Sequence, residues 1–325
     1  MGFRMHAVGV DIGGTKIAAG VVDDAGVIVA QARRETNPTD AGSIDHAIAE
    51  VVNEFAESYE FSAVGLAAAG FCSADREKVI FAPNIAWRDY PLAERVRGAL
   101  GRNDLSVVVE NDGNAAGWAE YVYGSGKGTS NMVMLTIGTG LGAAMVVDDR
   151  IVRGASGFAA ELAHIRVVPE GHLCGCGHRG CWEQYTSGSA LVREARQAAH
   201  DNPQGALMLL QKAGGDVDSL IGPHITEAAQ EGDTLAKALL AEVGTWLGEG
   251  CASIAAVLDP EIFVVGGGVI AAGDLLLEPA REAFEKALPA KGHRPIAPIV
   301  AADMGNDAGI VGAAALARVP TEARD

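Results

Sequence analysis

The chain has 325 residues, of which 49% are hydrophobic and 21% charged, which indicates a globular protein long enough for two domains. Lys and Arg number 25 and Asp and Glu 42, so the formal net charge is −17. A surface this acidic argues against nucleic acid and anionic membranes as partners.

The first third of the chain predicts strands that surround a glycine-rich turn. We expect strands at 7–10, 17–22 and 27–32, then a helix that starts with Asp40 or Ser43 as its N-cap and runs to about residue 59. Two buried strands follow at 63–68 and 107–109. The second ends in Glu110-Asn111-Asp112-Gly113, where a new helix should begin with Asp112 as N-cap.

The first strand–turn–strand pattern then returns. Strands at 132–137 and 143–147 enclose the loop 138–142, and Gly138 lies 125 residues after Gly13, which suggests two related halves. Residues 187–258 are mostly helical in pattern, and a strand at 261–265 leads into three glycines. A short strand at 299–302 and a helix at 307–318 complete the chain. No low-complexity linker separates these segments. We therefore expect two domains that are joined by short crossings of the chain and share a cleft.

Three glycine loops are candidates for phosphate binding, because glycine leaves backbone N–H groups open to an anion. They contain Asp11, Gly13, Gly14, Thr15 and Lys16; Gly138, Thr139 and Gly140; and Gly267 and Gly268. Tight hairpins without function remain the alternative. Gly266-x-Gly268-x-x-Ala271, with Glu285 further on, also fits a dinucleotide fingerprint. That motif needs a second strand, however, and residues 275–288 look helical.

Five cysteines are present, and three of them lie within Cys174–Cys181. This odd, clustered distribution favours a metal site in a reducing compartment over a disulfide framework. Cys174, Cys176 and Cys181 supply three thiolates, and His164, His172 or His178 would complete a tetrahedral zinc site. Three free thiols are the alternative. No export signal and no membrane span are apparent, so we expect a cytoplasmic protein.

The three loops resemble the phosphate-1, phosphate-2 and adenosine segments of the actin–hexokinase–Hsp70 ATPase superfamily. Glu161-Leu-Ala-His164, Cys174-Gly-Cys-Gly-His-Arg-Gly-Cys181 and Trp182-Glu183 resemble the signature of the ROK family (repressors, open reading frames and kinases). The resemblance covers essentially the whole chain from Asp11, and is strongest to the bacterial ROK glucokinases. It implies an α/β actin-like ATPase (ribonuclease H-like) fold, with two domains and an interdomain cleft. The expected domains are 1–111 plus 303–325, and 112–302 with the zinc-binding loop.

The resemblance also implies an activity and its residues. ATP with Mg²⁺ would phosphorylate a hexose, glucose first; fructose, mannose, allose and N-acetylhexosamines are the alternatives. Asp112 would be the catalytic base and the three glycine loops would bind ATP. The implied sugar ligands are Asn84, Asn111, Asp112, Glu161, His164 and Glu183, and the implied zinc ligands are His164, Cys174, Cys176 and Cys181. Members of the family are dimers or tetramers, so we expect a homo-oligomer.

ROK repressors supply a rival hypothesis. They carry a helix-turn-helix domain ahead of the sugar domain, whereas only ten residues precede Asp11 here. The net charge of −17 also argues against binding to DNA. A sugar-binding protein without catalysis would lack the base, but Asp112 is present. We therefore expect a kinase.

Overall fold

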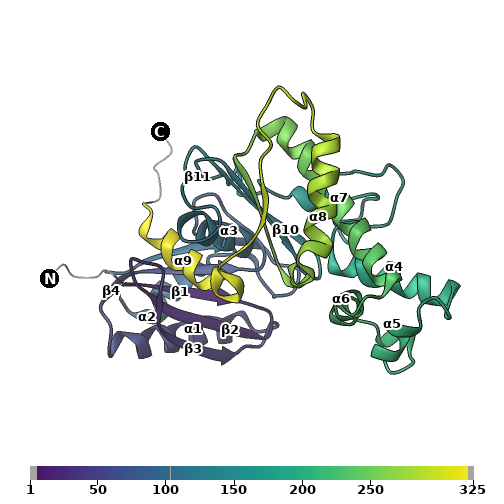
Figure 1. The fold of residues 1–325 in the computed structure, drawn as a ribbon. Helices are drawn as coiled ribbons and strands as arrows, with labels where there is room; N and C mark the ends of the chain where they lie inside the picture. Colours follow the sequence, from purple (N-terminus) through teal and green to yellow (C-terminus); the bar gives the residue numbers. More distant parts are fainter. Residues whose placement is uncertain (1–5, 103, 321–325) are drawn as a thin grey trace. The chain divides into compact units, whose positions relative to one another are not determined.

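The computed structural model describes residues 6–102 and 104–320 (Figure 1). Contacts between residues divide the chain into two compact units. The first unit comprises Met1–Gly128, Ala144–Ala160 and Asp303–Asp325, and the second comprises Thr129–Ala143 and Glu161–Ala302. In this division 112–128 and 144–160 group with the N-terminal part of the chain. The domain borders expected from the sequence stay a prediction.

A five-stranded sheet forms the centre of the first unit. Its order is β3-β2-β1-β4-β8, with antiparallel pairing from β3 to β1 and parallel pairing from β1 to β8. The strands are β1 (His6–Ile12), β2 (Lys16–Val22), β3 (Ile28–Glu35), β4 (Phe61–Ala68) and β8 (Ser106–Asn111). A small antiparallel sheet contains β5 (Phe71–Cys72), β6 (Val79–Phe81) and β7 (Arg88–Tyr90).

Helices cover both faces of the five-stranded sheet. Val8 and Val10 pack with α1 (Ala41–Ala56) and α2 (Leu92–Leu100), whereas Ala7, which precedes Val8 and points to the opposite face of the sheet, packs with α3 (Asp112–Val122) and α9 (Ala308–Arg318). The helix α9 lies directly on the strands, because a Cβ at Gly9 or Gly65 would come within 1.9 Å of an α9 carbonyl oxygen. Asp40 caps α1, as one of the two predicted alternatives has it.

The second five-stranded sheet has the order β11-β10-β9-β12-β13. Its strands are β9 (Met132–Ile137), β10 (Leu141–Val147), β11 (Arg150–Ile151), β12 (Ile262–Gly266) and β13 (Ile299–Ala301). The strand β12 pairs in parallel with both β9 and β13, whereas β10 and β11 pair with each other in antiparallel orientation. This order repeats that of the first sheet strand for strand, so the prediction of two related halves is confirmed at the level of topology.

The segment predicted to be mostly helical is helical. It contains α4 (Gly188–Asp201), α5 (Leu207–Lys212), α6 (Gly222–Gln230) and α7 (Thr234–Leu258), and α8 (Asp274–Ala287) follows β12. Short 3₁₀ turns are η1 (Leu162–His164), η2 (Trp182–Gln184), η3 (Val217–Ser219), η4 (Gly268–Ala272) and η5 (Gly305–Asp307). Glu285 lies on α8, where a dinucleotide fingerprint would need a strand. Within 6–102 and 104–320, no helix has the length and apolar character to cross a membrane.

Candidate active site

Two predicted site carboxylates lie at one edge of the first sheet. The strands β1 and β8 both run parallel to β4, and their last residues share one row, since Ile12 pairs with Ala68 and Ala68 with Asn111. Asp11 and Asp112 therefore meet at the carboxyl ends of these strands. They interact electrostatically, because the charge of Asp112 raises the pKa of Asp11.

The N-cap of α3 is Asn111, so the prediction that Asp112 caps this helix was wrong. Asn111 keeps the extended backbone that a cap requires, and its side-chain oxygen accepts the N–H of Asn114 at 3.0 Å. Asp112 already has helical geometry. Its Oδ1 accepts the Gly113 N–H at 2.9 Å and the Asn111 side-chain amide at 3.0 Å. Its Oδ2 accepts no bond from the described part of the chain, so this oxygen is open to a ligand.

Both carboxylates hold their protons more tightly than usual. Desolvation raises the pKa of Asp112, although the bonds from Gly113 and Asn111 oppose the shift. Desolvation and the neighbouring charge of Asp112 raise the pKa of Asp11 to about 6, against the smaller opposing effect of Lys16. Perturbed carboxylates at a strand edge are typical of functional sites.

The first glycine loop connects β1 to β2. The Gly13 N–H donates to the Lys16 carbonyl at 3.0 Å, which closes the hairpin. A Cβ at Gly14 would lie 3.5 Å from the Asn84 carbonyl oxygen, so the predicted phosphate loop and Asn84 are neighbours. Thr15, Lys16 and Asn84 are exposed and free to contact small molecules.

The second glycine loop, between β9 and β10, is held against the N-terminus of α4. The carbonyl oxygens of Gly138 and Thr139 accept the N–H groups of Gly188 at 2.8 Å and Ser189 at 3.2 Å. Among the described residues, nothing accepts the N–H groups of Thr139 and Gly140. A Cβ at Gly138 would meet nothing within 4 Å. Free donors beside open space suit a phosphate group.

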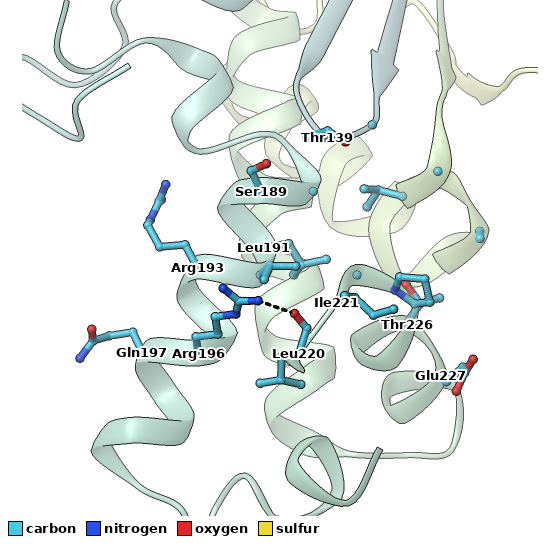
Figure 2. A pocket seen from close by; sticks show the side chains of 18 of the residues that line it. Thr139, Ser189, Leu191, Arg193, Arg196, Gln197, Leu220, Ile221, Thr226 and Glu227 are labelled. Atoms are coloured by element: carbon cyan, nitrogen blue, oxygen red, sulfur yellow. Dashed lines mark hydrogen bonds between the residues drawn. The ribbon is translucent and has the colours of Figure 1, made fainter. Parts of the chain in front are cut away.

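A pocket of about 1070 Å³ opens beside this loop in the second unit (Figure 2). Gly138, Thr139 and Gly268, three of the residues that are predicted to bind the nucleotide, line this pocket. Gly140 and Gly267 do not line it. A Cβ at Gly140 would point at Glu183, and Gly267 has a φ of +88° and lies against the Ile137 backbone.

Sequence reasoning missed the opposite walls of this pocket. They come from α4 and α6 and include Ser189, Arg196 and Thr226. Arg196 donates to the Leu220 carbonyl at 3.0 Å, which connects α4 to the segment before α6 (Figure 2). No short motif marks these positions, because they come together only through the packing of helices far apart in the sequence. The local sequence marks only the start of α4, where Ser187 is the N-cap and two small residues, Gly188 and Ser189, follow it.

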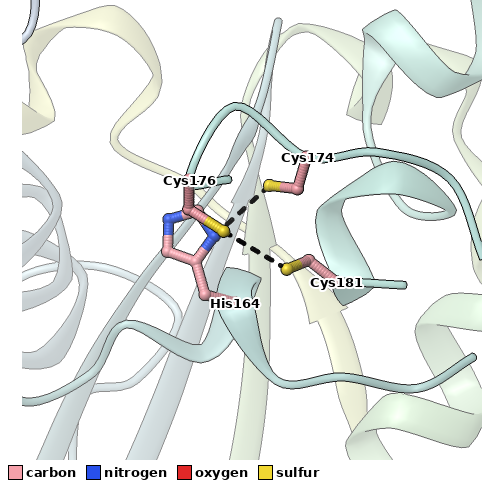
Figure 3. Close-up of side chains that lie close together, drawn as sticks. All are labelled: His164, Cys174, Cys176 and Cys181. Carbon is pink, nitrogen blue, oxygen red and sulfur yellow. Dashed lines mark hydrogen bonds between the residues drawn. The ribbon is translucent and has the colours of Figure 1, made fainter. Parts of the chain in front are cut away.

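His164, Cys174, Cys176 and Cys181 converge in the second unit (Figure 3). Their ligand atoms lie within 4.8 Å of one another. His164 Nδ1 is 3.7 Å from Cys174 Sγ, and the Cys176 and Cys181 sulfurs are 3.5 Å apart. A tetrahedral zinc ion would space two sulfurs by about 3.8 Å and a sulfur and a nitrogen by about 3.6 Å. The donor set and its spacing therefore fit zinc.

The side chains of the other two candidate histidines do not belong to this four-residue cluster. The His172 ring is tilted by 47° against that of Tyr185, and its Nε2 lies 3.8 Å from Glu194 Oε1. His178 meets the cysteine loop through its backbone, because its carbonyl accepts the Cys174 N–H at 2.8 Å. Of the three alternatives left open by spacing, the structure brings His164 to the cysteines.

Two carboxylates flank this cluster. Glu161 Oε2 lies 4.0 Å from His164 Nε2, the ring nitrogen that faces away from the sulfurs. Glu183 Oε2 accepts the Leu141 N–H at 3.2 Å, and its other oxygen is 3.8 Å from Cys174 Sγ. Glu183 therefore connects the cysteine loop to the glycine loop before β10.

Two sheets of one strand order, each with a glycine-rich hairpin, define an α/β protein with an actin-like ATPase fold. The chain belongs to the ROK family, whose family model matches residues 7–319. It is 49% identical to the glucokinase of Streptomyces coelicolor over 96% of this chain and 98% of that protein. It is 36% identical to the glucokinase of Halalkalibacterium halodurans, over 94% and 92%. A solved ROK family glucokinase from Streptomyces griseus, in complex with glucose and AMPPNP, superposes with a TM-score of 0.84 at 48% identity, over 96% and 99%.

Proposed function

We propose that this chain is an ATP-dependent glucokinase that converts glucose to glucose 6-phosphate. The observation that carries the proposal is the state of Asp112. This carboxylate has a raised pKa, one oxygen fixed by two hydrogen bonds and the other open. The likeness to glucokinases over almost the full chain supports glucose as the acceptor and ATP as the donor.

In the proposed reaction Asp112 Oδ2 accepts the proton of the glucose 6-hydroxyl. The hydroxyl oxygen forms a bond to the γ-phosphorus of ATP, and the bond from that phosphorus to the β,γ-bridging oxygen breaks to release ADP. Positioning and electrostatics carry most of the rate in phosphoryl transfer, so the two hydrogen bonds that fix Oδ1 contribute by holding Oδ2 in place.

Each unit supplies one set of proposed ligands. From the first unit, Asn84, Asn111 and Asp112 bind sugar hydroxyls, and the Asp11–Lys16 loop binds phosphate. Asp11 would help to hold the Mg²⁺ that accompanies ATP, and the ion would neutralise charge on the phosphates. From the second unit, Glu161, His164 and Glu183 bind the sugar, and Gly138, Thr139, Gly140, Gly267 and Gly268 serve the nucleotide. Carboxylates suit the sugar role because they accept hydrogen bonds from two hydroxyls at once.

We also propose that the four-ligand cluster holds a structural zinc ion. Four protein ligands would leave the ion no open position, so its contribution is to cross-link the loop that carries Glu183. His164, bound through Nδ1, would keep Nε2 for a sugar hydroxyl, and the metal bond would fix its tautomer.

A coupled assay for ADP, run with ATP across a panel of hexoses, tests the proposed function. Glucose should give the highest kcat/KM among glucose, mannose, fructose, allose and N-acetylglucosamine. A higher kcat/KM for another hexose would replace glucose as the acceptor and keep the kinase. Absence of sugar-dependent ADP release would contradict the kinase itself. A cytoplasmic location and a dimer or tetramer remain predictions; gel filtration with light scattering tests the second.

A further inference from the structure

A buried carboxylate lies directly before the predicted sugar ligand and base. Glu110 occupies the next-to-last position of β8, and its side chain is 3% exposed. Burial of a carboxylate is costly unless charge and hydrogen bonds compensate it. The partners of Glu110 therefore show what this arrangement holds in place.

One oxygen of Glu110 binds an arginine that is distant in sequence. Oε2 accepts Arg153 Nε at 2.8 Å and Arg153 Nη2 at 2.6 Å. Arg153 follows β11 and is 43 residues away from Glu110. Arg76 adds a second positive charge, with its Nε 3.7 Å from the same oxygen. The carboxylate is therefore neutralised from two other segments of the first unit.

The other oxygen holds the corner between β8 and α3. Oε1 accepts the Asn114 side-chain amide at 3.0 Å and the Asn111 backbone N–H at 3.3 Å. These two asparagines are joined by the N-cap bond, and the side chain of Asn111 donates to Asp112 Oδ1. A continuous chain of hydrogen bonds thus runs from Arg153 through Glu110 and Asn111 to the carboxylate of Asp112.

We infer that Glu110, held by Arg153, is a positioning residue that sets the orientation of the Asn111–Asp112 pair. The inference rests on the proposed function of that pair. Glu110 transfers no proton; it fixes the first turn of α3 in the geometry that orients Asp112 Oδ2. Misplacement of a reacting group by about 1 Å costs roughly 100-fold in rate, so a loosened corner should lower kcat.

The test compares Glu110→Gln and Arg153→Ala with a matched control, Asp45→Asn. Asp45 is also a buried carboxylate of the first unit, with its side chain 3% exposed. It lies on α1 and accepts hydrogen bonds from Arg95 of α2 at 3.0 Å and from Tyr90 of β7 at 2.6 Å, away from the start of α3. All three variants should unfold at lower denaturant concentration. At a temperature where each is fully folded, the first two should lose about 10- to 100-fold in kcat, while Asp45→Asn stays within about twofold.

A rescue experiment separates positioning from general destabilisation. Millimolar guanidinium, far below denaturing concentration, should restore part of the kcat of Arg153→Ala by replacing the missing cation, and should leave Asp45→Asn unchanged. The KM for ATP should stay nearly constant in all variants, since no glycine loop belongs to this network. Equal kcat in Glu110→Gln and Asp45→Asn, or no rescue, would overturn the inference.

Amide hydrogen exchange keeps this inference apart from the proposed function. Measured without substrate, exchange in residues 111–118 should accelerate in Glu110→Gln and not in Asp45→Asn. If wild-type protein fails to phosphorylate any hexose, the proposed function fails, but this difference would still support Glu110 as the residue that orders the corner. Unchanged exchange in Glu110→Gln would overturn that role whatever the activity.

Discussion

Two glycines of one loop face different neighbours, so the same substitution should have different effects at each. A Cβ at Gly138 enters open space beside the pocket, whereas a Cβ at Gly140 would lie 2.4 Å from Glu183 Oε2. Gly138→Ala should therefore raise the KM for ATP more than that for glucose. Gly140→Ala should push Glu183 aside and raise the KM for glucose more.

Steady-state kinetics of the two alanine variants test this contrast, and each is the control for the other. Neither glycine has a positive φ, so alanine introduces no backbone strain. Identical effects of both variants on the two KM values would contradict the assignment of Gly138 to nucleotide and Glu183 to sugar.

The raised pKa of Asp11 predicts a pH-dependent stability of the ligand-free protein. The pKa of Asp11 is about 6 in the folded state, whereas the ordinary value is 3.8. Protonated Asp11 is therefore compatible with folding below about pH 4, and the free energy of unfolding falls as the pH rises from there towards 6. Asp11→Asn should thus raise the free energy of unfolding at pH 7 by up to about 3 kcal/mol and change it little at pH 4. Urea unfolding at both pH values measures the difference; equal effects would show that Asp11 is not destabilised by its surroundings.

At the scale of elements, the cysteine loop is anchored on α7. Trp182 directly follows Cys181, is 1% exposed, and donates through its indole N–H to the Trp246 carbonyl at 2.9 Å. Glu183 is the next residue and reaches the Leu141 N–H of the glycine loop. A change in the metal cluster should therefore move a proposed sugar ligand before it disturbs the nucleotide pocket.

Cys176→Ala tests this link, because Cys176 is exposed and its removal leaves no cavity in the core. The variant should lose zinc, melt at lower temperature, and bind glucose more weakly with a smaller change for ATP. Elemental analysis should find about one zinc per wild-type chain. Cys72→Ala is the control, as its buried thiol lies outside the cluster and its zinc content should stay unchanged. A metal-free wild type with full glucose affinity would contradict the proposed zinc site.

Local patterns predicted those elements whose determinants are close together in sequence. The glycine hairpins, the start of α1 with Asp40 as one of two candidate caps, and the helical stretch before β12 are all predicted from short spacings. The cap of α3 was misassigned to Asp112, because Asn and Asp are equally good caps and only the end of β8 decides between Asn111 and Asp112. The Arg153–Glu110 pair joins segments 43 residues apart, so no local pattern could reveal it.

At the scale of the whole molecule, the two sheets share one strand order but carry different chemistry. Asp11 and Asn111-Asp112 lie at the carboxyl ends of β1 and β8 in the first sheet. In the second sheet, β9 leads into the glycine loop, which lies beside the pocket at α4. The resemblance to the family predicts both sets of residues from the sequence, whereas the pocket walls on α4 and α6 become visible only in the fold. A kinase needs both sets, so turnover tests the proposed function more directly than binding alone.

The most direct test is ATP-dependent glucose phosphorylation by the wild type and by Asp112→Asn, with glucose affinity measured by calorimetry on the same preparations. The amide keeps the shape of the side chain and the bonds at Oδ1, but cannot accept the hydroxyl proton. The account predicts glucose-dependent ADP release by the wild type, a loss of at least ~10²-fold in kcat for the variant, and glucose binding by both. Near-normal kcat in Asp112→Asn would contradict the account by reducing Asp112 to a residue that only starts a helix.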